Sequence, residues 1–402
     1  MKERADMLLS GGNVLLPSGD IEPIDVRIRG GYIVGLGPGA ALAQVDLGGR
    51  LLLPGIVDIH GDAFESVVQP RPETMIDLTL ALEETDRQLV ANGVTTAFYG
   101  LSWSWESNRG LRSGSEPARF LDQFEELRPN LRCDSQLHLR YEIHHLDALE
   151  TVLQWVHEAR IDLLAFNDHL NYIEEKIEDS DRIGILAARN GQTPEEYLAA
   201  HRAMRERYPY SLAGVERLAE AGRLAAIPMA SHDEESPDVR RWFHELGCRI
   251  CEFPVNEATA RHALELGDDV VLGAPNALRG SSLYKRLSAR RCAAEGLCTV
   301  LASDYYYPSL LAAAWDIHSR RGLELGRAWD LVSANPARAL GLTDRGRIEP
   351  GLRADLIAAE VGPNGLLQAA CTWTSGTMVY MGGTLAAQAF SGQGNVSGRV
   401  AA

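Results

Sequence analysis

The chain has 402 residues, a hydrophobic fraction of 45% and a formal net charge of −16. This length fits a barrel of about 250 residues with a smaller module beside it. The acidic balance argues against a nucleic-acid partner, whose usual signature is a basic patch, and no apolar run approaches the roughly 20 residues of a membrane span.

The first part of the chain has a different pattern of apolar residues and glycines from the part that follows it. Residues 1–52 contain short apolar runs punctuated by glycine, which predict a small β-structure. From Leu51 onward, strand-like runs alternate with amphipathic helical patterns. Eight such runs end near His60, Gly100, Glu142, Asp168, His232, Pro254, Pro275 and Asp304. This alternation predicts an α/β fold with a closed parallel barrel, a (β/α)₈ TIM-like barrel.

An open doubly wound sheet is the alternative fold, and it normally carries a glycine-rich turn after its first strand. No such turn follows the first run here. Residues 170–210 interrupt the alternation of strand and helix patterns with a charged helical segment. Within it, Pro194-Glu195-Glu196 indicates a helix start. This insertion is expected at the face where barrel active sites lie, either as a lid or as a surface elaboration.

After Ala337 the chain returns to short strands, and its final stretch is rich in glycine and serine, which predicts disorder. We therefore expect the two chain ends to build one small β-sandwich domain beside the barrel. The expected boundaries are 1–52 and 346–390 for the small β domain, 53–345 for the hydrolase barrel, and 391–402 for a disordered tail.

Metal-ligating residue types stand at the ends of five runs. These ends are Asp58-Ile59-His60-Gly61-Asp62, Arg140-Tyr141-Glu142, Asn167-Asp168-His169, Ser231-His232-Asp233 and Ser303-Asp304. Barrel enzymes place their catalytic groups at the carboxyl ends of strands, so these side chains are expected to converge. Imidazole and carboxylate ligands suit one or two divalent ions, with zinc as the first choice and manganese or iron as alternatives. The plainer interpretation is a set of salt-bridged residues without a metal.

The predicted ligands divide between two ions. His60 and Asp62, with one residue between them, can chelate the first ion. Glu142 can bridge both ions, because a carboxylate has two oxygens. His169 and His232 can hold the second ion.

Asp304, at the end of the eighth run, is the predicted catalytic residue. It can bind the first ion and form a hydrogen bond with the attacking water. A metal lowers the pKa of that water to about 7, which makes hydroxide available at neutral pH. Asp304 is then expected to accept the proton and to pass it to the leaving group.

Several motifs are similar to those of the amidohydrolase superfamily. The segment Leu53-Pro54-Gly55-Ile56-Val57-Asp58-Ile59-His60 resembles its opening, and Asn335-Pro336-Ala337 with Gly351-x-x-Ala354-Asp355-Leu356 resembles its close. Within that superfamily the chain most resembles the diphosphatases of phosphonate breakdown. The motifs in common are His60-x-Asp62, Pro70-Arg71-Pro72, Leu137-His138-Leu139-Arg140-x-Glu142, Asp168-His169, Ala230-Ser231-His232-Asp233, Glu252-Phe253-Pro254, Gly273-Ala274-Pro275-Asn276-x-x-Arg279-Gly280 and Ser303-Asp304-Tyr305-Tyr306.

The resemblance implies that diphosphate is released from a ribosyl methylphosphonate 5-triphosphate or a related small anionic substrate. It also implies that the segment from Gly273 to Gly280 contacts substrate, with Arg279 as a bidentate phosphate ligand. The predicted substrate-binding residues are Asn276, Arg279, Lys285 and Arg71.

Two substrate-side segments depart from the family pattern, at residues 281–286 and 170–173. The alternative function is therefore hydrolysis of a C–N bond in a cyclic amide, ureide or nucleobase by the same metal chemistry. If Arg279, Lys285 and Arg71 lined one pocket, phosphates would be favoured. A non-catalytic scaffold is a third hypothesis, but its signature would be a lost ligand, and none is lost.

Six cysteines are spread along the chain, and only Cys248 and Cys251 form a C-x-x-C pair. Without a second pair or nearby histidines, this pattern indicates buried thiols in a reducing compartment rather than a zinc site. The start of the chain is charged and lacks the apolar core of a signal peptide. We expect a cytoplasmic protein with a small-molecule partner, no nucleic-acid or membrane partner, and assembly as a homodimer.

Overall fold

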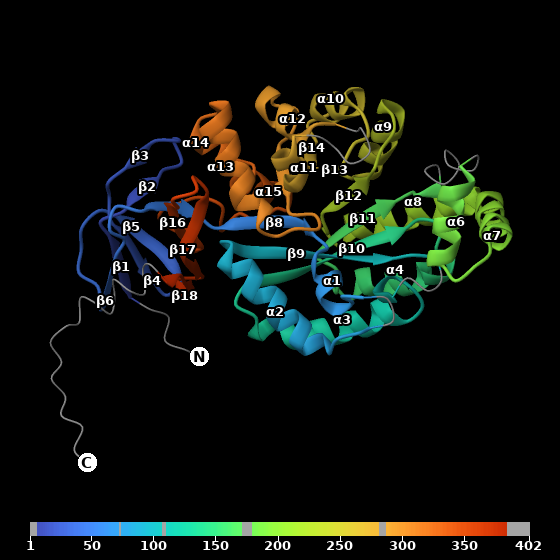
Figure 1. Ribbon diagram of the computed structural model, residues 1–402, viewed down its shortest axis with the longest axis horizontal. Helices are drawn as coiled ribbons and strands as arrows, with labels where there is room; N and C mark the ends of the chain where they lie inside the picture. Colours follow the sequence, from blue (N-terminus) through green and yellow to red (C-terminus); the bar gives the residue numbers. More distant parts are fainter. Residues whose placement is uncertain (1–5, 72–73, 107–109, 171–178, 281–286, 384–402) are drawn as a thin grey trace, which may run out of the picture.

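The computed structural model describes residues 6–71, 74–106, 110–170, 179–280 and 287–383. Its centre is a sheet of eight parallel strands that follow one another in sequence order (Figure 1). They are β8 (Ile56–Gly61), β9 (Val94–Trp103), β10 (Asp134–Glu142), β11 (Leu163–Asn167), β12 (Met229–His232), β13 (Ile250–Glu252), β14 (Asp269–Gly273) and β15 (Val300–Ala302). The predicted parallel barrel is confirmed.

The seam of the barrel joins the end of β15 to the end of β8. Gly61 and Asp304 form a parallel bridge across it. The amide of Asp304 donates to the carbonyl of His60, and the amide of Asp62 donates to the carbonyl of Asp304, both at 2.9 Å. Closing the sheet in this way brings the first and last strand ends together, although some 240 residues separate them in sequence.

Helices surround the strands, and short polar residues begin many of them. Asp77, Ser236 and Asn256 each accept a hydrogen bond from the backbone of the first helical turn that follows. The helices are α1 (Phe64–Val68), α2 (Leu78–Ala91), α3 (Glu116–Leu127), α4 (Leu149–His157), α6 (Ser180–Arg189), α7 (Pro194–Glu206), α8 (Tyr208–Leu224), α9 (Pro237–Leu246), α10 (Glu257–Glu265), α11 (Ala274–Arg279), α12 (Ala289–Glu295), α13 (Ser309–Arg321), α14 (Leu325–Asp330) and α15 (Ala334–Ala339), with 3₁₀ turns at Gly110–Arg112, Arg128–Asn130 and Leu146–Ala148.

Two smaller sheets lie at the left of Figure 1 and are built from both chain ends. Strand β16, from the C-terminal part, pairs with β7, from the N-terminal part. In spatial order, one sheet contains β5 (Tyr32–Leu36), β4 (Val26–Arg29), β1 (Met7–Ser10) and β6 (Ala43–Asp46), and the other contains β18 (Thr377–Met381), β17 (Leu367–Thr374), β16 (Leu356–Val361), β7 (Leu51–Pro54), β2 (Asn13–Leu15) and β3 (Ile21–Glu22).

One apolar cluster joins these two sheets, and it includes Ile28, Leu356 and Trp373. The predicted β-sandwich made from both chain ends is thus confirmed. Its exact boundaries stay predictions, and the expected tail at 391–402 lies outside the described residues.

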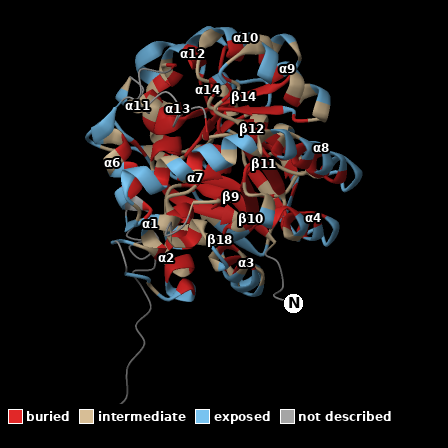
Figure 2. Cartoon of the chain, turned by 90° about the vertical axis from the view of Figure 1, so that its right-hand side faces the viewer, coloured by how far each residue is buried: buried red, intermediate tan, exposed pale blue. Residues whose placement is uncertain are grey.

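The barrel interior is packed rather than hollow. Its inward-facing side chains are small or branched and fully buried, as the central red strands of Figure 2 show. They include Val57, Ile59, Leu163, Ala165, Ala230, Ile250, Val271, Val300 and Ala302. Because apolar side chains fill the middle, polar inward-facing groups are concentrated at the carboxyl ends of the strands.

The predicted insertion after the fourth strand forms α6, α7 and the start of α8, beyond the ends of β10 and β11 in Figures 1 and 2. It packs on the segment that follows β9, where Asn190 and Tyr197 both donate to the carboxylate of Glu106. Whether it acts as a lid stays a prediction, and residues 171–178 lie outside the described part.

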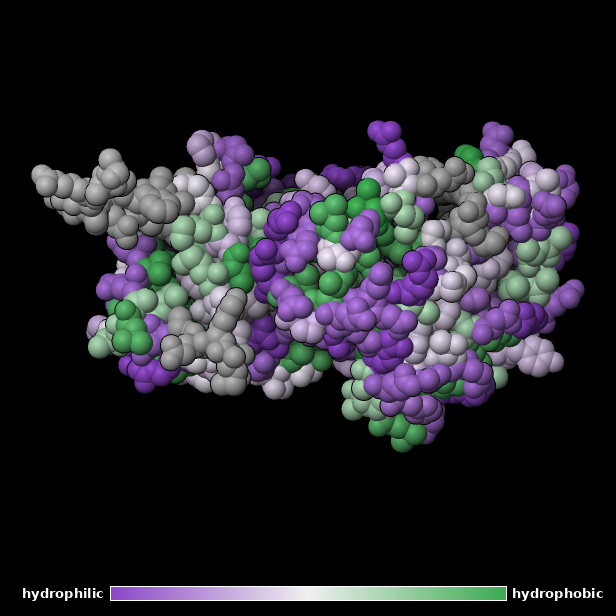
Figure 3. All heavy atoms as spheres, turned by 90° about the horizontal axis from the view of Figure 1, so that it is seen from below, coloured by the Kyte–Doolittle hydropathy of each residue, from purple (hydrophilic) through white to green (hydrophobic). Residues whose placement is uncertain are grey.

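No described helix combines the length and the apolar character that a membrane crossing requires. On the face shown in Figure 3, hydrophilic side chains surround small separate apolar patches.

Candidate metal centre and active site

The register of the parallel strands lines up four polar residues at one level of the barrel mouth. Glu142 is paired with Asn167, Asn167 with His232, and His232 with Glu252. His60, Asp62 and Asp304 complete the ring at the seam between β8 and β15. The strand ends that we expected to converge therefore do so. The sequence analysis did not single out Glu252, although it lies inside one of the family-like motifs.

Three non-glycine residues just after these strands adopt left-handed backbone conformations. They are Asp233, Phe253 and Asp304, with φ of 58°, 51° and 55°. Each of their amides donates a 2.9 Å hydrogen bond to the neighbouring strand: Asp233 to Glu252, Phe253 to Val271, and Asp304 to His60. Such backbone is unfavourable for a bulky residue and clusters at functional sites. Here it turns the chain sharply while keeping each side chain at the mouth.

The first group of metal-ligating atoms belongs to His169, His232 and Asp233, which lie within 4.8 Å of one another. The Asp233 carboxylate is 3.7 Å from Nε2 of His169 and 3.4 Å from Nδ1 of His232. Glu142 contacts the other nitrogen of His169. Oε2 of Glu142 and Nδ1 of His232 are buried and have no hydrogen-bond partner. Two imidazoles and two carboxylates with such unsatisfied atoms fit a divalent cation.

Asp62, which we expected to chelate an ion with His60, is surrounded by two arginines. Its carboxylate is 3.0 Å from Arg140 and 3.4 Å from Arg112. Arg140 also lies 3.3 Å from Nε2 of His232. Burial raises the pKa of Asp62, but Arg140 and Arg112 outweigh it and bring that pKa below its usual value. The sequence pattern places Arg140 at a strand end and in a family-like motif, but it was assigned no role at the site. Its position two residues before Glu142, on the same face of β10, was the available signal.

Burial also changes the ionisation of the other groups at the mouth. It raises the pKa of Asp304 to about 7, and the nearby carboxylate of Asp62 adds to this effect. Burial lowers the pKa of His60, and lowers that of His138 to about 3, so both rings are neutral at physiological pH. For His169, burial lowers the pKa, but Glu142 and Asp233 outweigh it and raise it to about 10.

These pKa values predict that Asp304 releases more protons on metal binding at lower pH. Asp304 must be ionised to bind a cation, and a group with a pKa of about 7 holds about 0.9 proton at pH 6 but only about 0.1 at pH 8. His169 is protonated at both pH values and contributes equally. Calorimetric titration of the metal-free protein in buffers of different ionisation enthalpy is expected to detect this difference. Asp304→Asn is expected to remove the Asp304 contribution, so native protein is expected to release about 0.9 proton more than the variant at pH 6 but only about 0.1 more at pH 8. An equal excess at both pH values would contradict the prediction.

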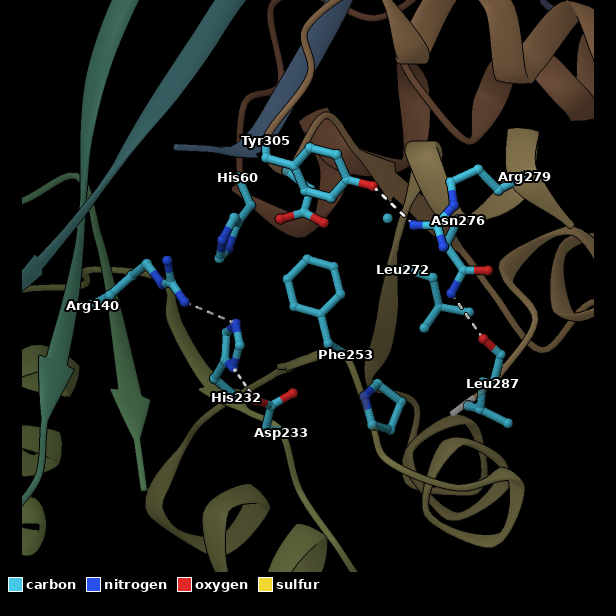
Figure 4. Close-up of a pocket in the computed structure, with 13 residues that line it drawn as sticks. His60, Arg140, His232, Asp233, Phe253, Leu272, Asn276, Arg279, Leu287 and Tyr305 are labelled. Carbon is cyan, nitrogen blue, oxygen red and sulfur yellow. Dashed lines mark hydrogen bonds and ion pairs between the residues drawn. The ribbon is translucent and has the colours of Figure 1, made fainter. Parts of the chain in front are cut away.

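A cavity of about 200 Å³ opens beside the predicted ligands (Figure 4). Its lining includes His60, His232 and Asp304 from the proposed centre, and also the cationic side chains of Arg140 and Arg279. The guanidinium of Arg279 donates to the hydroxyl of Tyr305 at 3.3 Å. The cavity therefore combines metal-ligating groups with two arginines that can bind an anion.

The other predicted substrate-binding residues are placed differently. Asn276 lines the cavity, but its amide donates to the carbonyl of Leu287 and accepts from the amide of Ala289. These contacts anchor the chain that follows residue 286. Arg71 is exposed and is not among the described residues that line the cavity. Lys285 lies outside the described residues, so the three expected cations are not seen together in one pocket.

A second cavity, of about 370 Å³, shares His232 and Asp233 with the first. Its wall differs in character, because it includes the aromatic rings of Tyr208 and Trp242. The carboxylate of Asp168, also in this wall, accepts hydrogen bonds from His144 and from the amide of Leu170 at 3.0 and 3.1 Å. The described lining contains carboxylates but neither arginine nor lysine. The two cavities therefore share His232 and Asp233, but of their described linings only that of the first contains arginines.

Comparisons with known proteins identify relatives of this chain. The model of the amidohydrolase family matches residues 256–385. The chain is 32% identical over 323 residues to the α-D-ribose 1-methylphosphonate 5-triphosphate diphosphatase of Escherichia coli strain K12, covering 77% of this chain and 83% of that protein.

It is also 26% identical over 373 residues to the adenine deaminase of Cereibacter sphaeroides. That match covers 89% of this chain but only 56% of the deaminase, so the chain spans little more than half of that relative. Among solved structures, the 5-methylcytosine deaminase of Klebsiella pneumoniae aligns with a TM-score of 0.61 at 14% identity, covering 94% of this chain and 98% of that one. At that identity the likeness concerns the fold alone.

Proposed function

The chain belongs to the amidohydrolase family, and from that premise we propose that this metal-dependent hydrolase releases diphosphate from a ribosyl 5-triphosphate. The proposed substrate class is that of α-D-ribose 1-methylphosphonate 5-triphosphate, the substrate named for the E. coli relative. One observation supports this choice most strongly. Arg140 and Arg279 line the same cavity as His60, His232 and Asp304, so phosphate-binding cations lie beside the proposed metal ligands.

One or two divalent ions, with zinc as the first choice, fit the donor atoms at the mouth. When bound, such an ion supplies Lewis acidity, which lowers the pKa of water and stabilises charge on phosphoryl oxygens. We propose that Asp233 joins the ligands expected from the sequence, because its carboxylate lies between two of the histidines. The full proposed set is His60, Asp62, Glu142, His169, His232, Asp233 and Asp304.

Asp304 is the proposed acid–base group of the reaction. A carboxyl group with a pKa of about 7 is suited to accept a proton at neutral pH and to return it later. Its backbone is held by hydrogen bonds across the barrel seam. Arg140 is buried and lines the cavity, so its guanidinium is placed to donate to a phosphate oxygen there. Arg279, at the outer side of the cavity, is the second proposed phosphate ligand.

Arg279→Ala is expected to raise KM for a ribosyl triphosphate by about 10- to 100-fold, because a charge-assisted hydrogen bond contributes roughly 1.5–3 kcal/mol. The value of kcat is expected to change much less, because Arg279 lies away from the ligands and contacts Tyr305. Steady-state kinetics checks this. Arg71→Ala is the matched control, since that arginine is exposed and absent from the described lining. An unchanged KM for the Arg279 variant would rule out its phosphate role.

Turnover on a substrate panel tests the proposal itself. The metal-reconstituted protein is assayed for diphosphate release from ribosyl and nucleoside 5-triphosphates, beside cyclic amides and nucleobases assayed for ring opening or ammonia. Diphosphate release that Asp304→Asn abolishes is the expected result. Turnover of an amide without any diphosphate release would overturn it.

The second candidate function is C–N hydrolysis of a nucleobase or other cyclic amide. The second cavity favours it, because carboxylates can accept hydrogen bonds from ring N–H groups and aromatic side chains can stack on a flat ring. The similarity to adenine deaminases points in the same direction. Ammonia release that is lost on Trp242→Ala, with no diphosphate from any triphosphate, would favour this candidate.

A further inference from the structure

A deeper group of polar side chains lies beneath the proposed ligands. His60, His138 and Glu252 are at most 1% exposed, and their ligating atoms lie within 4.8 Å of one another. Nδ1 of His60 is 3.1 Å from Oε1 of Glu252, and Nε2 of His138 is 3.6 Å from Oε2. The two rings meet edge to face, with 4.9 Å between their centroids. Of these three residues, only His60 belongs to the proposed ligand set.

Glu252 is an unusual residue for such a buried position. It is a fully buried carboxylate whose ion-pair partners, within the described residues, are the two imidazoles and no arginine or lysine. Its Oε2 and both ring nitrogens of His138 have no hydrogen-bond partner. Burying a carboxylate with so little compensation is unfavourable, and replacing all three side chains by well-packed apolar residues would be neutral or stabilising. Stability alone therefore does not account for Glu252.

The contact between Glu252 and His60 has a chemical consequence. An ionised carboxylate only accepts hydrogen bonds, so the contact with ionised Glu252 assigns the proton to Nδ1 of His60. A neutral imidazole protonated at Nδ1 presents its lone pair at Nε2, the nitrogen available to a metal. The ring of Phe253 meets His60 edge to face at 5.0 Å and restricts its rotation from another side (Figure 4).

We propose that Glu252 is a positioning residue that holds His60 in the tautomer and orientation required for metal ligation, with His138 facing its second oxygen. Carboxylates that accept from a ligating histidine orient the ring and raise its basicity, and removing them lowers metal affinity by about 10- to 100-fold. The proposal rests on the proposed function, because it assumes that His60 is a metal ligand. Glu252 acts through His60 and lines neither of the two described cavities.

Metal titration of the full chain tests this role without relying on turnover. Metal-free native protein and its Glu252→Leu and Glu252→Gln variants are titrated with Zn²⁺ against a chromophoric chelator, and with Co²⁺ while the visible absorption is followed. Glu252→Leu is expected to weaken the binding of one ion by about 10- to 100-fold and to shift the Co²⁺ bands. Glu252→Gln is expected to weaken it by a smaller factor, because the amide oxygen can still accept from Nδ1.

The thermal unfolding of the metal-free variants separates positioning from packing. Glu252→Leu leaves Nδ1–H of His60 without an acceptor, so its unfolding temperature is expected to fall, whereas Glu252→Gln keeps an acceptor and is expected to unfold close to native protein. Weaker metal binding by the Gln variant at a native-like unfolding temperature would therefore reflect positioning. Asp86→Asn is the matched control for Glu252→Gln, because Asp86 is an equally buried carboxylate that accepts from Arg132 and Cys133 and lines neither described cavity. It is expected to leave metal affinity and the Co²⁺ bands unchanged. If Glu252→Leu does not fold, the metal affinity and the Co²⁺ bands of Glu252→Gln alone test the positioning role.

Two outcomes would overturn the proposal. Native metal affinity in the Glu252 variants would show that His60 needs no carboxylate partner. The loss of one whole ion per chain in both Glu252→Leu and His138→Leu would mean that the three side chains bind a metal themselves. Neither outcome depends on which substrate is hydrolysed. Failure of the substrate panel would overturn the proposed function and leave the titrations able to judge Glu252.

Discussion

Asp304→Asn is expected to lower kcat by about two to four orders of magnitude, the usual contribution of a general acid–base group. Asn has nearly the same shape as Asp and tolerates the left-handed backbone of this position, where φ is 55°. The hydrogen bonds between residue 304 and the end of β8 involve backbone atoms only, so the substitution leaves them in place. What is lost is the carboxylate, whose pKa of about 7 fits proton transfer at neutral pH.

Steady-state kinetics and metal analysis of the same preparation check this expectation. The other proposed ligands remain in the Asn variant, so most of its metal is expected to stay bound. Near-normal turnover at native metal content would remove Asp304 from the mechanism. A variant that lost both metal and activity would assign it a ligand role without isolating the proton-transfer role. Asp304→Glu, which keeps the charge in a longer side chain, then serves as the second variant.

Arg140→Gln is expected to lower kcat/KM for a ribosyl triphosphate by about 10- to 100-fold, because a buried charge-assisted hydrogen bond to phosphate is lost. Arg140 is only 7% exposed, lies between Asp62 and His232, and lines the cavity. Arg140→Lys keeps the charge but not the planar fork of donors, so an intermediate loss is expected. The effect is expected mainly in KM.

The matched control is Arg112→Gln. Arg112 also pairs with Asp62, at 3.4 Å, but its guanidinium contacts Glu65 as well and does not line the described cavity. If the role of Arg140 is to bind phosphate, the Arg140 variants are expected to lose affinity for inorganic triphosphate by the same factor. Arg112→Gln is expected to bind inorganic triphosphate almost as tightly as native protein. Equal losses in both arginine variants would instead mean that they act through Asp62.

The sequence pattern predicted the elements of the barrel well because each buried parallel strand is a local signal. The run expected to end near His60 ends at Gly61, and those expected to end near Glu142 and His232 end at those residues. The polar residues at the ends of these runs could be recognised from their type and position alone. Both the predicted barrel and the predicted β-sandwich from the two chain ends are confirmed.

Contacts between strands were beyond the reach of the sequence pattern. The carboxylate of Glu252 meets His60, 192 positions away in sequence, because the register of β12 on β13 and the closure of the barrel bring them together. Asn276 looked like a substrate ligand within a family-like motif, yet its amide is bonded to the backbone beyond residue 286. Arg71, expected at the site from its motif, is exposed.

By itself, the sequence determined the kind of barrel, the strand ends that carry polar residues, and the metal chemistry that such residues allow. Hydrophobic periodicity and residue type are local properties, and they are sufficient for these conclusions. Only the tertiary structure decided which polar groups face one another, such as Arg140 with Asp62 and Glu252 with His60. Strand register, barrel closure and the left-handed turns after β12, β13 and β15 set those pairs, and each depends on contacts between distant parts of the chain.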